Sequence, residues 1–251
     1  MFNIAQHCHV ESDILNKLGS YSFLSWAWFT EEEFTSSLLK CSNTSTPGPN
    51  KLSWRHLKIV LKGKTCLRNI ISIANACIKL GHWLSHFKIS LTIIISKSNK
   101  ASYNSLKSFR PIVLLNTLGK LIEKVISDRI QSHVVVNNFI HHSQLGSLKF
   151  KSTTDMGITL THFICMGWVK NMTTSTLIFD ISQFFPFLNH HLLSLILKKV
   201  GLDPLIVQFF PVILSIEVYN MFGTIFPLIL LMLMLEWVKA RPYLPFYQLF
   251  I

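Results

Sequence analysis

The feature that most constrains this chain is an apolar run, Thr176 to Phe179, that ends in a single carboxylate, Asp180. Its β-branched and aromatic content predicts a strand. The polar residues after Pro186 predict a turn into a helix. A strand with an acid at its C-terminal end can hold a divalent metal ion at a sheet edge. The alternative is that Asp180 only caps the following helix.

The charge of the chain favours a polyanionic partner. Its 251 residues carry 24 Lys and Arg against 12 Asp and Glu, which gives a formal net charge of +12. This excess suits nucleic-acid binding, although a basic soluble surface or a membrane-facing one would have the same sign. A chain of this length makes one or two domains and can bury a substantial core.

The cysteines argue against a disulfide framework or a zinc knuckle. Their number is odd, no Cys-x-x-Cys pair occurs, and their spacings are wide. We therefore expect reduced thiols with no disulfide partner in an intracellular protein, nuclear or cytoplasmic. Residues 1–20 lack a positive segment followed by an apolar one, so no signal peptide is expected. The cysteines are Cys8, Cys41, Cys66, Cys77 and Cys165.

Several capping signals predict helices. Thr30 followed by Glu31, Glu32 and Glu33 is typical of a helix start with a capping box. Ser152 or Thr153, with Asp155, predicts another start, and Gly81 predicts a helix end. Pro47-Gly48-Pro49 predicts a rigid turn, followed by a helix that includes Trp54. Apolar periodicity predicts helices over residues 67–80, 119–130 and 191–200, and β-branched content predicts a strand over 91–95.

Two cations frame a predicted hairpin. The strand over 91–95 is followed by a polar turn with Lys97 and Lys100, and Arg110 then lies in a second apolar stretch. Arg binds phosphate as a planar fork and Lys binds it as a point charge. Such a hairpin can therefore bind a triphosphate. The alternative is that Lys97 and Lys100 are solvated loop charges.

These stretches, taken in this order, resemble the reverse transcriptase domain of non-LTR (LINE-type) retrotransposons. Leu177 to His190 is similar to motif A of that family. Residues 109–124 read Phe-Arg-Pro-Ile-x-Leu-Leu-Asn-x-Leu-Gly-Lys-x-x-Glu-Lys, which is similar to the fingers of the family. Gln144 to Gly146 and Ser152 to Asp155 are similar to its Gln-x-Gly and Ser-Thr-x-Asp elements. The resemblance covers residues 30–210.

The resemblance implies roles for individual residues. Asp180 would be a catalytic carboxylate and a ligand of the cofactor Mg²⁺. Lys97 and Arg110 would contact the incoming deoxynucleotide, and Phe185 would check its sugar at the 2′ position. The implied partners are deoxynucleotides and an RNA/DNA template-primer. Template contact is implied for Gln144, Gly146, Lys149 and Lys151, where the glycine allows close backbone approach and the lysines add charge.

The resemblance stops near Phe210. Two-metal chemistry needs a second strand with paired aspartates. After Asp180 the only acids are Asp203, Glu217 and Glu236, and no two are adjacent. We therefore expect a catalytically inactive chain.

The C-terminal residues form an apolar tail that we interpret as read out of frame. The codons for residues 236–251 can be read in a shifted frame as a sequence similar to motif B of the family. The run from Phe209 to Leu235 is also long enough to span a bilayer, so membrane association through this tail is an alternative.

Together these patterns predict an α/β (α+β) chain. We expect a partial right-hand polymerase fold, with helix-rich fingers and an incomplete antiparallel palm sheet. The predicted domains are a linker (1–29), a fingers-like part (30–175), the start of the palm (176–215) and the apolar tail (216–251). The predicted function is a reverse transcriptase-like fragment of a retrotransposon. The alternatives are a non-enzymatic basic nucleic-acid-binding protein and a membrane-associated protein.

Overall fold

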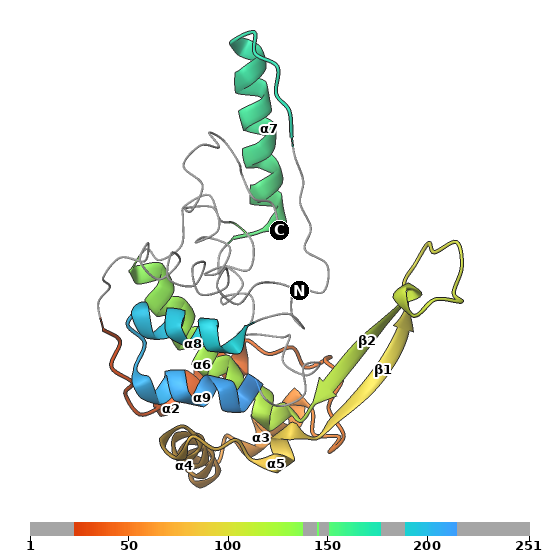
Figure 1. Ribbon diagram of the computed structural model, residues 1–251. Coiled ribbons are helices and arrows are strands. Elements are labelled where there is room, and N and C mark those ends of the chain that lie inside the picture. The colour runs from red at the N-terminus through yellow and green to blue at the C-terminus, as the bar shows by residue number, and fades with distance from the viewer. Residues whose placement is uncertain (1–22, 138–144, 146–150, 177–188, 215–251) are drawn as a thin grey trace, which may run out of the picture. The chain divides into compact units, whose positions relative to one another are not determined.

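The computed structural model describes the chain in four parts, residues 23–137, 145, 151–176 and 189–214 (Figure 1). Contacts divide the chain into two compact units, and each is described by itself. The larger described unit contains Ser25–Asp128 and the residues from Asp203. The other contains Arg129–Leu202. The motif A stretch around Asp180 and the apolar tail lie outside the described residues.

The larger unit begins with two short helices that follow the capping signals. Helix α2 (Glu31–Leu39) starts at Thr30, whose hydroxyl accepts from the Glu33 amide while the Glu33 carboxylate accepts from the Thr30 amide. This is the predicted capping box. Helix α3 (Trp54–Val60) starts after Ser53. The Lys58 Nζ donates to the Cys41 carbonyl at 2.7 Å, which ties α3 to the end of α2.

Helix α4 (Lys64–Leu80) ends as predicted at Gly81, whose φ of 58° is left-handed. Its buried side includes Ile71, Ala74 and Ile78, and it packs with α2 and with α9 (Pro204–Leu214). An aromatic cluster links the same core, because the ring of Trp83 lies 5.8 Å from that of Phe209. These contacts form the hydrophobic core of this unit.

A short helix, α5 (Ser85–Lys88), leads into an antiparallel hairpin. Strand β1 (Ser90–Ser96) pairs with β2 (Phe109–Leu115), with Ser90 opposite Leu115 and Ser96 opposite Phe109. The 3₁₀ turn η1 (Leu106–Ser108) precedes β2. Figure 1 shows the hairpin projecting away from α3, α4 and α5. Most of β1 and much of β2 are therefore exposed.

Asn116 joins the hairpin to helix α6 (Thr117–Val136) and is buried. Its Oδ1 accepts from the Asn50 amide at 3.3 Å, and its Nδ2 donates to the His86 carbonyl at 2.7 Å. A Cβ on Gly48 would overlap the backbone of Leu115 and Asn116. The Pro-Gly-Pro turn and the Leu-Leu-Asn stretch, which are separate motifs in the sequence, thus pack directly against each other.

The second unit contains α7 (Thr153–Val169) and α8 (His190–Lys199). Ser152 caps α7 in a box with Asp155, and Asn189 caps α8 through the Leu192 amide at 3.0 Å. Hydrogen bonds from the Ser152 hydroxyl and backbone lower the pKa of the Asp155 carboxyl. Helix α8 buries one apolar side, whereas α7 leaves much of its apolar surface exposed, including Ile158, Phe163, Met166 and Trp168.

The mixed α+β class is confirmed by these helices and the two-stranded antiparallel sheet. Two elements were not predicted, α5 and α9. The start of α9 carried a readable signal, because Asp203 precedes Pro204 at the first helical position and its Oδ1 accepts from the Leu205 amide at 2.9 Å. Helix α7 continues to Val169, and Lys170 is its C-cap.

Within the parts of the chain that are described, no helix is both long enough and apolar enough to cross a membrane. The partial polymerase fold and the four-part domain division stay predictions. The palm strand and the tail on which they depend fall outside those parts.

Candidate nucleotide-binding hairpin

Two of the predicted site residues lie on the β1–β2 hairpin. Arg110 is in β2, opposite Ile95 in β1. The Lys97 amide donates to the Ser108 carbonyl at 2.8 Å, so the ladder continues one step beyond the strand ends. Side chains alternate between the two faces of a sheet, and directly opposite residues share a face. Lys97, Ile95 and Arg110 therefore lie on one face.

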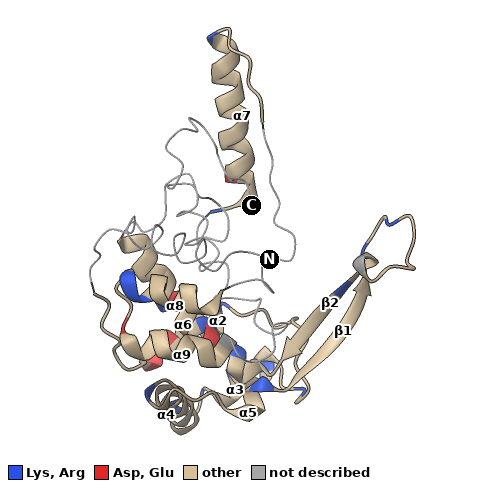
Figure 2. Ribbon diagram, viewed as in Figure 1, with Lys and Arg blue, Asp and Glu red and all other residues tan. Residues whose placement is uncertain are grey.

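Lys97 and Arg110 are diagonal neighbours on this face. Diagonal pairs across an antiparallel ladder lie roughly 7–8 Å apart, which is within the combined reach of two long side chains. Arg110 is exposed and Lys97 is half-buried. The chain has no acid between Glu33 and Glu123, so no carboxylate occurs on the hairpin (Figure 2). The face is thus cationic and able to attract an anion.

The loop that carries Lys97 is held by its own contacts. The Tyr103 hydroxyl donates to the Lys97 carbonyl at 2.8 Å, and the Tyr103 ring lies 5.9 Å from the Phe109 ring. The Ser108 hydroxyl donates to the Ser102 carbonyl at 2.7 Å. These bonds fold the loop back over the end of the ladder. The sequence singled out Lys97 and Arg110, but Tyr103 emerges as a positioning residue only from the structure.

The face also carries exposed apolar residues around the two cations. Ile93 lies opposite Ile112, and their exposed fractions are 40% and 42%. Ile95 is 46% exposed. A ligand on this face would therefore meet both positive charge and apolar surface. Lys100, in the loop, is exposed, in agreement with a solvated charge.

Of the four predicted template residues, the structure describes Lys151 alone. Lys151 is described, is exposed, and directly precedes the Ser152 cap of α7. It belongs to the smaller unit, whereas Lys97 and Arg110 belong to the larger one. Gln144, Gly146 and Lys149 lie outside the described residues, as do Asp180 and Phe185. Their roles stay predictions.

The described acids do not provide a metal site. In the described ranges, no group of three or more His, Cys, Asp or Glu side chains could hold a metal ion. Asp203 is the described acid that follows Asp180 in the sequence. Its Oδ2 accepts from the Trp26 amide at 2.9 Å and its Oδ1 from the Leu205 amide at 2.9 Å. Each oxygen of Asp203 therefore accepts one backbone hydrogen bond, one of them at the start of α9.

Comparison with known proteins places the chain in a defined class. A family model described as reverse transcriptase (RNA-dependent DNA polymerase) matches residues 95–225, which include most of the hairpin and helices α6 to α9. The chain belongs to the reverse transcriptase family. The resemblance drawn from the hairpin, the Gln-x-Gly stretch and motif A is confirmed at the level of the family.

Two curated relatives come from fly transposons. The chain is 27% identical over 128 residues to the "Probable RNA-directed DNA polymerase from transposon BS" of Drosophila melanogaster, covering 51% of this chain and 14% of that protein. It is 25% identical over 156 residues to the "RNA-directed DNA polymerase from mobile element jockey" of Drosophila funebris, covering 62% and 17%. The chain therefore spans less than a fifth of the length of these relatives. Both relatives come from mobile elements, which agrees with the resemblance to LINE-type retrotransposons.

Proposed function

We propose that this chain is the fingers and the first part of the palm of a retrotransposon RNA-directed DNA polymerase, and that its hairpin binds the triphosphate of a deoxynucleotide. The observation that carries the proposal is the shared face of Lys97 and Arg110 on a hairpin without acids. Arg110 would bind phosphate oxygens as a fork, and Lys97 would add a point charge.

The proposal includes the roles inferred for residues outside the hairpin. Gln144, Gly146, Lys149 and Lys151 would contact template nucleic acid, Phe185 would contact the sugar, and Asp180 would bind Mg²⁺. When bound, Mg²⁺ would neutralise the charge that develops on the transferred phosphate. A single carboxylate is a poor site for this ion, which prefers six oxygen ligands. We propose that the chain binds nucleotides but does not polymerise them.

Equilibrium binding of a fluorescent deoxynucleoside triphosphate tests the hairpin. Arg110→Gln is expected to weaken binding about 10-fold or more, because a charge-assisted hydrogen bond contributes about 1.5–3 kcal/mol. Lys100→Gln, in the loop of the same hairpin, is the control, and it is expected to bind as the unsubstituted chain does. Equal affinity of the Arg110 variant and the unsubstituted chain would remove the proposal.

A nucleic-acid-binding role without catalysis is the second candidate. The net charge of +12 and the acid-free stretch between Glu33 and Glu123 favour it. Salt-sensitive binding of RNA by the full chain, with no nucleotide binding at the hairpin, would favour this candidate over the first.

A further inference from the structure

The outer edge of strand β1, on the side away from β2, is uncovered in the described part of the chain. Every residue from Leu91 to Ser96 is exposed. On β2, in contrast, Val113 and Leu114 are half-buried and Leu115 is buried. Among the described residues β1 pairs with β2 alone, and Figure 1 shows no described element beside its outer edge.

The hydrogen-bond ladder determines which backbone groups lie on that edge. Residues opposite each other in an antiparallel pair alternate between bonded and non-bonded pairs. Lys97 and Ser108 are a bonded pair, because the Lys97 amide donates to the Ser108 carbonyl. Thr92 and Val113, five steps further along the same register, are therefore a non-bonded pair. The N–H and C=O groups of Thr92 point away from β2, toward the outer edge of β1.

The two edges of the hairpin differ in the hydrogen bonds that they can make. Ile94 and Pro111 are also a non-bonded pair, so their backbones point outward on opposite edges. Proline has no N–H, so the outer edge of β2 lacks a donor at its centre. Strand β1 contains no proline, glycine or charged residue over its seven positions. An edge without these features readily pairs with another strand, which favours the edge of β1 over that of β2.

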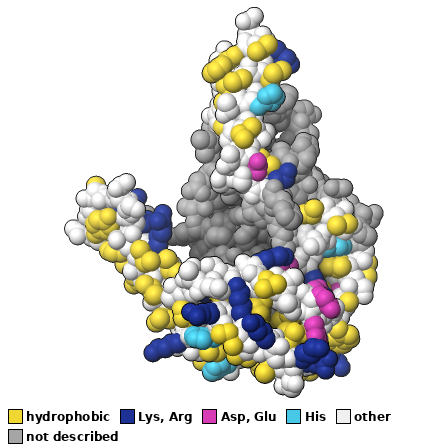
Figure 3. Space-filling model, turned by 180° about the vertical axis from the view of Figure 1, so that it is seen from behind, with side chains coloured by type: hydrophobic (Ala, Val, Ile, Leu, Met, Phe, Trp, Pro, Cys, Tyr) yellow, Lys and Arg dark blue, Asp and Glu magenta, His cyan; other side chains and the backbone are white. Residues whose placement is uncertain are grey.

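Cations lie at both ends of β1. Lys88 is two residues before the strand, and Lys97 follows it directly. The chain has no acid between Glu33 and Glu123. Figure 3 shows the hairpin as the lobe at the left, with hydrophobic side chains along it, basic ones near its loop and no acidic ones on the visible face. The edge of β1 is thus an apolar stretch between two positive ends.

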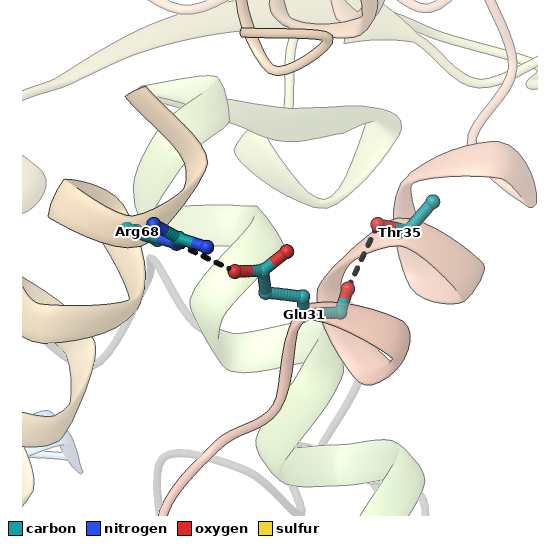
Figure 4. Close-up of polar contacts among 3 residues, drawn as sticks. All are labelled: Glu31, Thr35 and Arg68. Atoms are coloured by element: carbon teal, nitrogen blue, oxygen red, sulfur yellow. Dashed lines mark hydrogen bonds and ion pairs between the residues drawn. The ribbon is translucent and has the colours of Figure 1, made fainter. Parts of the chain in front are cut away.

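Acids near the hairpin in the sequence are engaged in other parts of the larger unit. The Glu31 carboxylate accepts from Arg68 in α4, with Oε1 2.9 Å from Nε, and the Glu31 carbonyl accepts from the Thr35 hydroxyl (Figure 4). The Glu33 carboxylate belongs to the capping box of α2. Glu123, after the hairpin, is buried on α6. An acidic partner of the hairpin cations would therefore come from another molecule.

A second copy of the chain is a poor partner for this edge. If two β1 strands paired in parallel, Lys88 would lie near Lys88 and Lys97 near Lys97. If they paired antiparallel about Ile93, Lys97 would lie opposite Ile89 of the second copy, next to its Lys88. Like charges at such positions are destabilising. Both orientations also bring together two chains that each have a formal net charge of +12.

We propose that the outer edge of β1 binds an extended segment of another protein as an added β-strand, and that this segment has an apolar centre with acidic residues at both ends. The backbone groups of Thr92 and Ile94 would make the hydrogen bonds of the new ladder. The acidic ends would lie near Lys88 and Lys97. The inference does not depend on nucleotide binding, because a strand added at an edge leaves both faces of the hairpin uncovered.

Binding of three labelled peptides to the full chain at low ionic strength tests the edge. The first is Glu-Glu-Val-Thr-Val-Thr-Val-Glu-Glu, and the second has Lys in place of each Glu. We expect the acidic peptide to bind about 10-fold or more tightly, since exposed charges attract or repel most strongly at low salt. The third is the acidic peptide with N-methylated Val and Thr amides. It keeps the charge but has no N–H groups to pair with a strand, so we expect no measurable binding.

Thr92→Pro and Val113→Pro are a matched pair of variants, because the two residues lie opposite each other in one non-bonded pair. Each removes an outward N–H without removing a hydrogen bond between β1 and β2. Thr92→Pro is expected to weaken binding of the acidic peptide about 10-fold, through the loss of one backbone hydrogen bond and the bulk of the proline ring. Val113→Pro, on the other edge, is expected to leave peptide affinity unchanged.

Four results would overturn the proposal. Equal affinity of the acidic and Lys-flanked peptides would show that the ends of the segment are not recognised. Equal affinity of the N-methylated peptide would show that charge alone matters. Equal losses in the two proline variants would exclude the edge of β1 as the site. A dimer in analytical ultracentrifugation that Thr92→Pro dissociates would identify a second copy as the partner. If a proline variant unfolds, the three peptides still decide on the unsubstituted chain.

Nucleotide binding separates this proposal from the one made for the hairpin face. Thr92 lies on the opposite face from Lys97 and Arg110, so Thr92→Pro is expected to keep its affinity for the fluorescent deoxynucleoside triphosphate. If Arg110→Gln leaves nucleotide binding unchanged while the peptides rank as expected, the nucleotide proposal fails and the edge proposal stands. If the peptides do not rank as expected, the edge proposal fails alone.

Discussion

The hairpin and helix α6 follow one another in the chain, joined at Asn116, yet they have opposite environments. Both are rich in Ile, Leu and Val. On the hairpin Ile94 is 69% exposed, whereas on α6 Leu121 and Ile122 are fully buried. Apolar content alone therefore did not decide burial. Each strand of the hairpin pairs only with the other strand, and no layer packs over the hairpin in the described part of its unit. Helix α6, in contrast, is buried on most sides.

The difference indicates which residues stabilise the fold and which are free to contact a ligand. Burial of an aliphatic side chain contributes about 1.5–3 kcal/mol, and an exposed one contributes little. Residues on the hairpin can therefore change with small effects on folding, which suits a surface that contacts ligands. Residues on α6 hold the unit together, and substitutions there are expected to act on stability. Four substitutions test this contrast, and they are given in order from the largest expected effect on stability to the smallest.

The largest expected effect is that of Leu121→Ala. It removes a fully buried side chain from α6 and should lower the free energy of unfolding by about 2–5 kcal/mol. Ile94→Ala on the hairpin is the matched comparison and should change it by less than about 0.5 kcal/mol. Urea denaturation followed by circular dichroism measures both. Equal losses would show that the hairpin is part of the core.

A pH-dependent effect is expected at Glu123, which is 8% exposed on α6. Burial raises the pKa of its carboxyl from the usual 4.5 to about 7, while Lys120 acts in the opposite direction. Because the folded pKa is the higher one, unfolding releases a proton between these values, and stability falls as the pH rises from about 4.5 to 7. The penalty is complete above pH 7 and absent below 4.5.

Glu123→Gln should remove this penalty. At pH 8 the variant is expected to be more stable by about 3 kcal/mol, since one pKa unit corresponds to about 1.36 kcal/mol. At pH 4 the two chains should have similar stability. Thermal unfolding at both pH values measures the difference, and Glu32→Gln, at an exposed glutamate of α2, is the control. A variant that is less stable at pH 8 would show that the ionised carboxylate is paired rather than penalised.

Asn116→Ala tests the junction between the two regions. The change removes a donor and an acceptor that hold His86 and Asn50, and it should cost about 1–2 kcal/mol because two partly buried hydrogen bonds are lost. Asn69→Ala, at an exposed position of α4, should cost nothing. Chemical denaturation of both variants gives the comparison. A neutral Asn116 variant would mean that the Pro-Gly-Pro turn is held by packing alone.

The smallest stability effect is expected from Arg110→Gln. The side chain is exposed on β2, so the free energy of unfolding should change by less than about 0.5 kcal/mol. The same variant is expected to lose nucleotide affinity, and this separation of binding from folding is what the contrast predicts. A melting temperature that falls as far as that of Leu121→Ala would remove the contrast.

Local signals in the sequence predicted much of the described fold. The capping boxes at Thr30 and Ser152 and the left-handed glycine at Gly81 depend on neighbouring residues only, and all three were confirmed. The hairpin was predicted from β-branched content and a polar turn. Family resemblance added Arg110 to the site, and the structure places it on the same face as Lys97.

Other features depend on residues far apart in the chain and could not be predicted locally. Asn116 was part of a recognised motif, but its bonds to Asn50 and His86 cross 66 and 30 positions. The burial of Glu123 likewise follows from tertiary packing, because acids on an amphipathic helix are normally exposed. The hydrogen bond that Asp203 accepts from the Trp26 amide, 177 positions away, could not be predicted either.

Primer extension tests the central proposal that this chain retains a nucleotide-binding hairpin without polymerase chemistry. The full chain would be incubated with a primed RNA template, deoxynucleotides and Mg²⁺, and primer length would be followed over time. The account predicts no extension, because no pair of adjacent aspartates follows Asp180 in this sequence. Mg²⁺-dependent extension that Asp180→Ala abolishes would contradict it.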